Sequence, residues 1–130
     1  MTAKIMADRR YTKTDEWVKV EDDEAVIGIS DYAQDSLSDI VYVELPDVGE
    51  AFDAGAPFGV VESVKAASDI LLPISGEVVA TNDAAVDAPE SLNSDPFGVW
   101  LVRVRMSDPS QVDGLMDAAA YEAYCATREH

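Results

Sequence analysis

Short β-rich runs separated by turn residues occupy most of this chain, and they restrict it to a mainly β fold. Residues 17–20 and 25–29 flank an acidic turn, which is typical of a hairpin. Residues 40–45 form a nearly continuous apolar run that ends at Pro46, whose nitrogen cannot donate to a strand ladder. The sequence therefore predicts several short strands.

Another predicted strand lies at residues 100–106, where apolar and polar side chains alternate. Trp100, Val102, Val104 and Met106 would share one face, and two arginines the other. This pattern predicts a half-buried strand near the edge of the β structure.

Two helices are expected beside the strands. Ser30 is suited to cap a helix N-terminus, Asp31 favours the positive end of the helix dipole, and Ala33, Leu37 and Ile40 have helical spacing. This short helix is expected to cross the β core.

The second helix is expected at the end of the chain, capped by Asp117. Tyr121, Tyr124 and Cys125 share one face of it, so the helix should dock through its tyrosines. Cys125 is interpreted as a packing residue, because no His lies near it in the sequence.

A lysine is predicted to lie at the tip of a hairpin. Residues 57–63 and 70–72 are candidate strands, and residues 64–68 form a connection of hairpin length that contains Lys65. Small residues follow Lys65, which leaves the side chain accessible to an enzyme.

The string Leu-Pro-x-x-Gly-Glu occurs twice, at residues 45–50 and 72–77, each time between two candidate strands. It indicates either a duplicated half of the β structure or the ordinary use of Pro and Gly in turns.

Length and composition limit the classes of function. The 130 residues suit a single domain, 1–130, with a β core at 10–106 and a C-terminal helical segment at 107–128. The net charge of −17 argues against nucleic-acid and membrane partners, which select clusters of Lys and Arg. The charge suits a partner with basic patches and equally well a role in solubility.

The sequence has no signal-peptide-like start and no apolar stretch of about 20 residues, so the chain is expected to be cytoplasmic.

No set of side chains in the sequence supports catalysis by itself. The single His130 is the last residue, so neither a Ser-His-acid triad nor a histidine metal site can be assembled, and a lone Cys125 provides neither a disulfide nor a multi-cysteine zinc site. We therefore expect no catalytic and no metal-binding residues, and chemistry supplied by a group attached to Lys65.

At this point the chain resembles the glycine cleavage H-protein family, from Arg10 to the last helix. The resemblance depends on several separate motifs, which are Tyr11-Thr12-Lys13, Glu16-Trp17-Val18, Gly28-Ile29-Ser30-Asp31-Tyr32-Ala33-Gln34, Val43-Glu44-Leu45-Pro46, Phe58-Gly59-Val60-Val61-Glu62-Ser63-Val64-Lys65-Ala66 and Ser75-Gly76-Glu77-Val78.

The resemblance implies a barrel-sandwich hybrid fold and a covalent lipoyl group on Lys65, with Glu62, Ser63, Val64 and Ala66 as its immediate context. It implies a carrier, not an enzyme, that shuttles the aminomethyl group of glycine. The implied partners are glycine decarboxylase (P-protein), aminomethyltransferase (T-protein), dihydrolipoamide dehydrogenase (L-protein) and the lipoate-attaching enzyme. The carrier itself is expected to be a monomer.

The family also protects the loaded aminomethyl group in a cleft with acidic side chains, and Glu16 and Asp69 match those positions. Two departures affect this region. Asp15 stands where the family usually has His, and the segment 95–101 is one residue shorter and lacks the glycine before Trp100.

Two alternatives remain open. A related lipoate-binding protein could serve sulfur oxidation or lipoyl relay to other enzymes, and an unmodified family member could act as a binding module. A biotin carrier is not expected, because such carriers commonly have methionines on both sides of the lysine, whereas Val64 and Ala66 flank it here.

Overall fold

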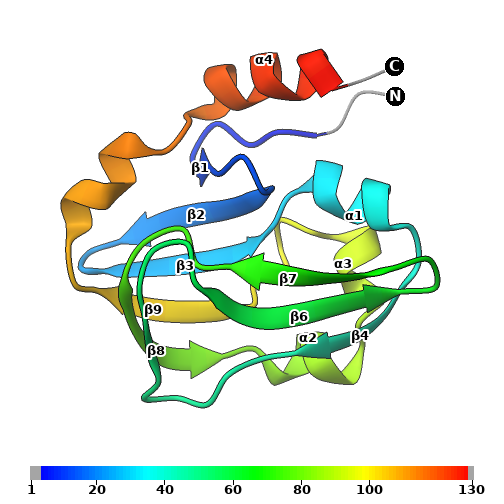
Figure 1. Ribbon diagram of the computed structural model, residues 1–130, viewed down its shortest axis with the longest axis horizontal. Helices are drawn as coiled ribbons and strands as arrows, with labels where there is room; N and C mark the ends of the chain where they lie inside the picture. Colours follow the sequence, from blue (N-terminus) through cyan, green and yellow to red (C-terminus); the bar gives the residue numbers. More distant parts are fainter. Residues whose placement is uncertain (1–3, 129–130) are drawn as a thin grey trace.

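The computed structural model describes residues 4–128 and consists of two open β-sheets with short helices around them (Figure 1). The mainly β barrel-sandwich hybrid expected from the sequence is confirmed, and neither sheet closes on itself. In chain order the elements are β1 (Arg10–Tyr11), β2 (Glu16–Glu21), β3 (Glu24–Ile29), α1 (Asp31–Leu37), β4 (Ile40–Glu44), β5 (Ala51–Phe52), β6 (Pro57–Ser63), β7 (Ala67–Leu71), β8 (Gly76–Thr81), α2 (Asp83–Asp87), α3 (Ser91–Ser94), β9 (Val102–Met106), a 3₁₀ helix (Pro109–Gly114) and α4 (Ala118–Arg128).

The larger sheet has the strand order β1-β2-β3-β9-β8-β5, and the smaller one β4-β6-β7. Strand β9 is therefore interior, and its predicted place near an edge is wrong. Val104 pairs with Ala25 of β3 on one side and with Val78 of β8 on the other. Such long-range pairing leaves no trace in the alternation of a single strand.

Alternation along β9 is confirmed for three of the four apolar residues. Val102, Val104 and Met106 are buried in the main core, which the two sheets enclose. Trp100 lies before the strand and packs on a second cluster, around Tyr11 and Trp17, so its predicted place on the same face is wrong.

Helix α1 begins as the sequence predicts, because Ser30 Oγ accepts a hydrogen bond of 3.2 Å from the backbone N–H of Ala33. It ends at Leu37, since Ser38 adopts a positive φ of 66° that helices do not continue. Ile40, whose spacing suggested the helix, is instead a buried residue at the start of β4.

The end of the first Leu-Pro-x-x-Gly-Glu string is hydrogen-bonded to Val78, the residue that follows the second string. The N–H of Gly49 donates to the carbonyl of Val78 at 2.8 Å, and the N–H of Val78 donates to the carbonyl of Glu50 at 2.8 Å. The ends of the two copies thus lie antiparallel to each other and lead into the β5–β8 pair.

Helix α4 docks through its tyrosines, as predicted. Asp117 Oδ1 accepts a hydrogen bond of 2.8 Å from the N–H of Ala120 at the start of the helix. Tyr121 is fully buried and stacks on Tyr11 with ring centroids 4.4 Å apart. Cys125 is buried beside it, which confirms a packing role for this thiol.

Within residues 4–128, no helix has both the length and the apolar character that a membrane span requires. The single His130 lies outside the described residues.

Candidate functional site

Lys65 lies at the tip of the hairpin formed by β6 and β7, which projects at one end of the molecule (Figure 1). Glu62 pairs with Ala67, and the turn comprises Ser63 to Ala66. The connection is thus shorter than the predicted 64–68, because Ala67 and Ser68 already belong to β7. A short turn leaves Lys65 little backbone freedom while exposing its side chain.

Ser63 organises this turn. Its N–H donates to the carbonyl of Ala66 at 2.7 Å, and its Oγ accepts from the N–H groups of Lys65 at 3.2 Å and Ala66 at 3.0 Å. A hydroxyl that takes up two backbone donors gives the turn an internal support that does not depend on the rest of the fold.

Two contacts connect the tip to the end of α1 and to the segment that follows it. The Lys65 ammonium donates a hydrogen bond of 3.0 Å to the carbonyl of Ser36, in the last turn of α1. The N–H of Val64 donates to the carbonyl of Asp39 at 3.0 Å. Sequence analysis missed Ser36 and Asp39, because they act through backbone carbonyls, which carry no residue-specific signal.

The other predicted neighbours of Lys65 differ in exposure. Val64 and Ala66 are exposed beside the lysine, and Glu62 is half-buried between Tyr42 of β4 and Ala67 of β7. The geometry thus presents an exposed lysine side chain that an enzyme can approach from solvent.

Glu16 is buried, with only 2% of its surface exposed, and connects the two sheets. Its carboxylate accepts from the hydroxyls of Thr12 and Thr14 and, at 3.2 Å, from the N–H of Leu71 on β7. Burial raises the pKa of Glu16 above its ordinary value, and these three donors offset part of that shift. The charge of Glu16 is already largely engaged within the protein.

Asp69 is exposed on β7, opposite Val60 of β6. It lines a groove of about 510 Å³ together with Glu44, Asp47 and Glu50. Asp69 lies two residues along the strand from Leu71, the backbone partner of Glu16, so β7 brings the two predicted acidic positions to neighbouring places. Between Glu16 and Asp69 themselves, no hydrogen bond is present in the described part of the chain.

Asp15, the residue in place of the expected His, forms an ion pair with α4. Both carboxylate oxygens accept hydrogen bonds from the Arg128 guanidinium, at 2.6 and 3.1 Å, and Oδ1 also accepts from Tyr121 OH at 2.7 Å. This pairing raises the pKa of Arg128. The guanidinium lies 4.0 Å from the Tyr32 ring centroid and 4.3 Å from that of Tyr124.

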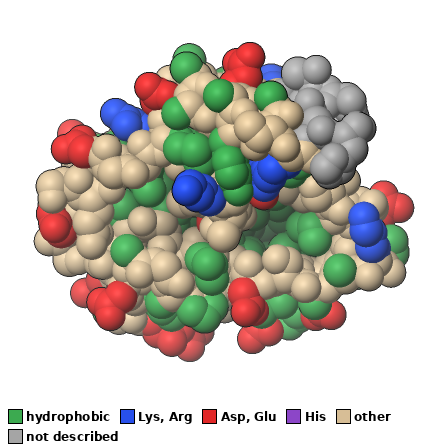
Figure 2. All heavy atoms as spheres, turned by 45° about the horizontal axis from the view of Figure 1, so that its top comes forward, with side chains coloured by type: hydrophobic (Ala, Val, Ile, Leu, Met, Phe, Trp, Pro, Cys, Tyr) green, Lys and Arg blue, Asp and Glu red, His purple; other side chains and the backbone are tan. Residues whose placement is uncertain are grey.

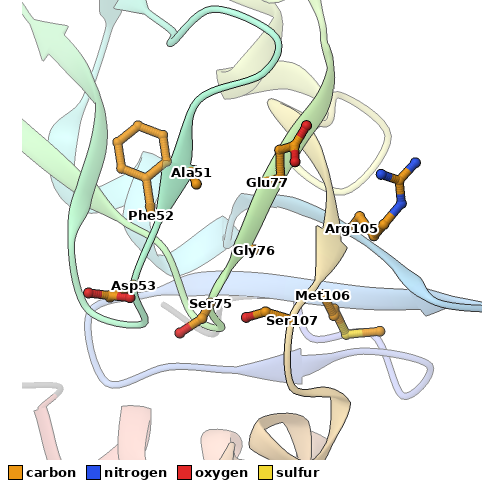
Figure 3. A pocket seen from close by; sticks show the side chains of 9 residues that line it. All are labelled: Ala51, Phe52, Asp53, Ser75, Gly76, Glu77, Arg105, Met106 and Ser107. Atoms are coloured by element: carbon orange, nitrogen blue, oxygen red, sulfur yellow. The ribbon is translucent and has the colours of Figure 1, made fainter.

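A separate pocket of about 410 Å³ lies between β5, β8 and β9 (Figure 3). Phe52 and Asp53 line it on one side, and Arg105 and Met106 on the other. None of its lining residues belongs to the Lys65 turn, so it forms no part of the site around Lys65. Among residues 4–128, no group of three or more His, Cys, Asp or Glu side chains is arranged to hold a metal ion.

Comparisons with known proteins agree on one family. The sequence model described as "Glycine cleavage H-protein" matches residues 9–128. Glycine cleavage system H protein 1 of Caldanaerobacter subterraneus subsp. tengcongensis is 52% identical over 124 residues, which cover 95% of this chain and 99% of that protein. The H protein of Myxococcus xanthus is 49% identical, over 95% of this chain and 96% of that one.

A solved structure supports the same assignment. The crystal structure of a glycine cleavage system H protein from Mycobacterium marinum superposes with a TM-score of 0.85 at 37% identity, and covers 95% of this chain and 98% of its own. Sequence and fold therefore agree along nearly the whole length, and the chain belongs to the glycine cleavage H-protein family.

Proposed function

We propose that Lys65 is the attachment residue for a lipoyl group, and that with it the chain acts as the lipoyl carrier of the glycine cleavage system. The family carries lipoate and consists of carrier proteins, not enzymes. The observation that carries the assignment to Lys65 is its place at the exposed tip of the β6–β7 turn.

The residues around Lys65 fit such a group. Its amine donates to one exposed backbone carbonyl, that of Ser36, and among the described residues no carboxylate pairs with it that would have to be displaced. Ala66 and Ala67, which follow it, are small and exposed. In attachment, the ammonium first gives a proton to a base, and the amine nitrogen then forms an amide bond to the activated carboxyl carbon. The bond from that carbon to its activating group breaks, and the nitrogen loses a second proton and keeps one N–H.

Each part of the turn has a role in this arrangement. When bound, the lipoyl group supplies a disulfide that accepts the aminomethyl group and is afterwards reoxidised by thiol-disulfide chemistry. Ser63 keeps the turn folded, and β6 and β7 hold Lys65 away from the core. Conversion of the Lys65 ammonium to an amide removes the positive charge that lies beside the last turn of α1. The hydrogen bond to the Ser36 carbonyl is then no longer strengthened by that charge.

The family places the chain among the components of glycine cleavage, and we propose that its partners are glycine decarboxylase, aminomethyltransferase and dihydrolipoamide dehydrogenase. The lipoate-attaching enzyme is a further partner. A cytoplasmic location and a monomeric state stay predictions from the sequence.

For the loaded arm we propose that Asp69, which is exposed on β7, provides the carboxylate that faces the aminomethyl ammonium. Glu16 supports strand β7 by accepting a hydrogen bond from the N–H of Leu71. The expected readout is the lifetime of the aminomethyl-loaded protein, isolated from the other components. Asp69→Asn should accelerate the spontaneous release of ammonia and formaldehyde without affecting lipoylation. A rate equal to that of the wild type would exclude a protective role for Asp69.

The main test is attachment itself. The wild-type chain incubated with lipoate, ATP and a lipoate-attaching enzyme should gain one lipoyl mass, which a tryptic map should place on Lys65. Lys65→Arg keeps a positive charge but lacks the acceptor amine, so it should gain no mass and support no glycine cleavage. Lys13→Arg and Lys19→Arg are matched controls that should be modified normally. An adduct on the Lys65→Arg variant would contradict the proposal.

Among residues 4–128, no contact favours service in another lipoyl-dependent pathway. The relatives at about 50% identity named above are glycine cleavage proteins. Asp15, which departs from the family pattern, has a structural partner in Arg128, so this departure needs no change of pathway to explain it.

A further inference from the structure

Strand β4 carries a bulge beside the Lys65 turn. Ile40 pairs with Ser63 and Tyr42 pairs with Glu62, so Val41 is an extra residue that has no partner on β6. Ile40 and Val43 are buried in the core, whereas Val41 and Tyr42 are 55% and 44% exposed. The bulge therefore turns two consecutive apolar side chains outward, which a regular strand cannot do.

These side chains lie next to the tip of the hairpin. The pairing of Ile40 with Ser63 places the start of β4 beside the end of β6, and the hydrogen bond from Val64 to Asp39 fixes the turn against the residue before β4. Val64 is itself 70% exposed. Val41, Tyr42 and Val64 are thus exposed apolar residues on the Lys65 turn and on the strand beside it, and we name them the tip patch. Tyr42 also lines a groove with Val86 of α2.

Carboxylates surround the tip patch. Asp39 precedes β4, Glu44 ends it, and Glu62 lies opposite Tyr42. In the described range, 4–128, none of these three carboxylates is in a salt bridge. An apolar centre with a charged margin is characteristic of a protein-binding surface. Because the margin of the tip patch is acidic, a complementary partner would present basic residues to it.

We propose that the tip patch is the docking surface for the enzyme that acylates Lys65, and that this enzyme receives it in an apolar depression with basic residues at the margin. The proposal rests on the proposed function of Lys65. The amine stands at the end of a four-carbon stem, so an active site that acylates it must cover the turn and the residues at its base. Enzymes that act on the finished arm work at its far end and have no such need.

A second copy of this chain is a poor occupant of the same surface. Two tip patches facing each other would bring the carboxylates of Asp39, Glu44 and Glu62 together, in a chain whose net charge is already −17. The charge of the margin therefore favours a basic enzyme over self-association.

The experiment compares the steady-state lipoylation of variants, with lipoate, ATP and the lipoate-attaching enzyme, followed by intact mass. Val41→Asp and Tyr42→Ser should raise KM for the carrier about tenfold, as expected for the loss of an apolar anchor, and leave kcat unchanged. Val20→Asp is the control, since Val20 is also exposed, at 45%, but lies on β2 near the turn at the opposite end of the molecule (Figure 1). It should keep the wild-type KM.

Two results would overturn the proposal. One is a wild-type KM for both tip-patch variants. The other is normal lipoylation of Val41→Asp combined with the loss of glycine decarboxylation by its lipoylated form, which would assign the patch to the decarboxylase. Failure of the proposed function is distinguishable, because it would appear as an unmodified wild type or a modified Lys65→Arg variant.

Discussion

Ser63 stabilises the turn that contains Lys65 by hydrogen bonds to the backbone. Its hydroxyl accepts the N–H groups of both Lys65 and Ala66. Ser63→Ala should therefore cost about 0.5 to 1.5 kcal/mol of stability and slow lipoylation, because the turn loses its internal acceptor. Ser68→Ala is the control, since Ser68 Oγ has only a long contact of 3.4 Å to the carbonyl of Asp69. Equal lipoylation rates for the two variants would show that the turn does not need Ser63.

Glu16 leads to a prediction about pH. Its pKa is raised by burial, so the folded state binds a proton more readily than the unfolded chain does. The stabilising effect of this group is complete below the ordinary glutamate pKa of 4.5 and is lost as the pH rises through the folded-state pKa. Urea unfolding between pH 4 and 8 should thus show Glu16→Gln gaining stability relative to the wild type as the pH rises. A difference that is independent of pH would contradict the raised pKa.

At the scale of residues, the sequence predicted the positions that act through a named side chain in a local context. Ser30 and Asp117 cap helices as expected, and Lys65 is at a tip. Contacts of Lys65 with Ser36 and of Glu16 with Leu71 were not predictable, because their partners are backbone groups of distant segments.

At the scale of elements, α4 is fastened to the rest of the protein by Arg128. The guanidinium binds both oxygens of Asp15 and lies against two tyrosine rings. Asp15 also accepts Tyr121 OH, which shares a hydrogen bond with the helix-capping Ser30. Through Tyr121, the last helix is connected to Ser30 at the N-terminus of α1, whose other end contacts Lys65.

Arg128→Gln should release the end of α4. We expect a loss of about 1 to 3 kcal/mol, because charged hydrogen bonds and ring contacts disappear together, and faster hydrogen exchange along α4. Arg103→Gln is the control, because it removes a more exposed pair with Glu21 and Glu24 and should cost at most about 1 kcal/mol.

Asp15→His, which introduces the residue usual in the family, should destabilise this chain, because Arg128 then faces an imidazole ring and has no carboxylate partner there. An Asp15→His variant as stable as the wild type would show that the ion pair contributes nothing.

Elements were predictable where their signal is local and not where it depends on the order of strands. The hairpin of β2 and β3, the start of α1 and the docking face of α4 were predicted correctly. The interior place of β9 between β3 and β8 was not, because an alternating strand reads the same at an edge and beside two neighbours. Trp100 was assigned to the wrong face since the strand begins two residues later.

On the scale of the whole molecule, charge dominates encounters with other proteins. The net charge is −17, and Figure 2 shows acidic side chains around the margin of one face, with apolar and a few basic side chains nearer its centre. Association of the lipoylated protein with glycine decarboxylase should therefore be steered towards a basic surface and slow down as salt rises. Stopped-flow measurements at low and at physiological ionic strength test this. A rate that does not change with salt would leave solubility as the role of the charge.

The interior position of β9 determines the order in which parts of this protein can form during synthesis. The larger sheet is incomplete until residue 106 has left the ribosome, because Glu24 must pair with Arg105. Tyr11 acquires its last partners later still, because its bridge to Met116 and its stacking on Tyr121 need the C-terminal residues. The hairpin of β6 and β7, in contrast, has its partners close by in the chain. The residues that form the acceptor turn are thus all synthesised before the larger sheet can be completed.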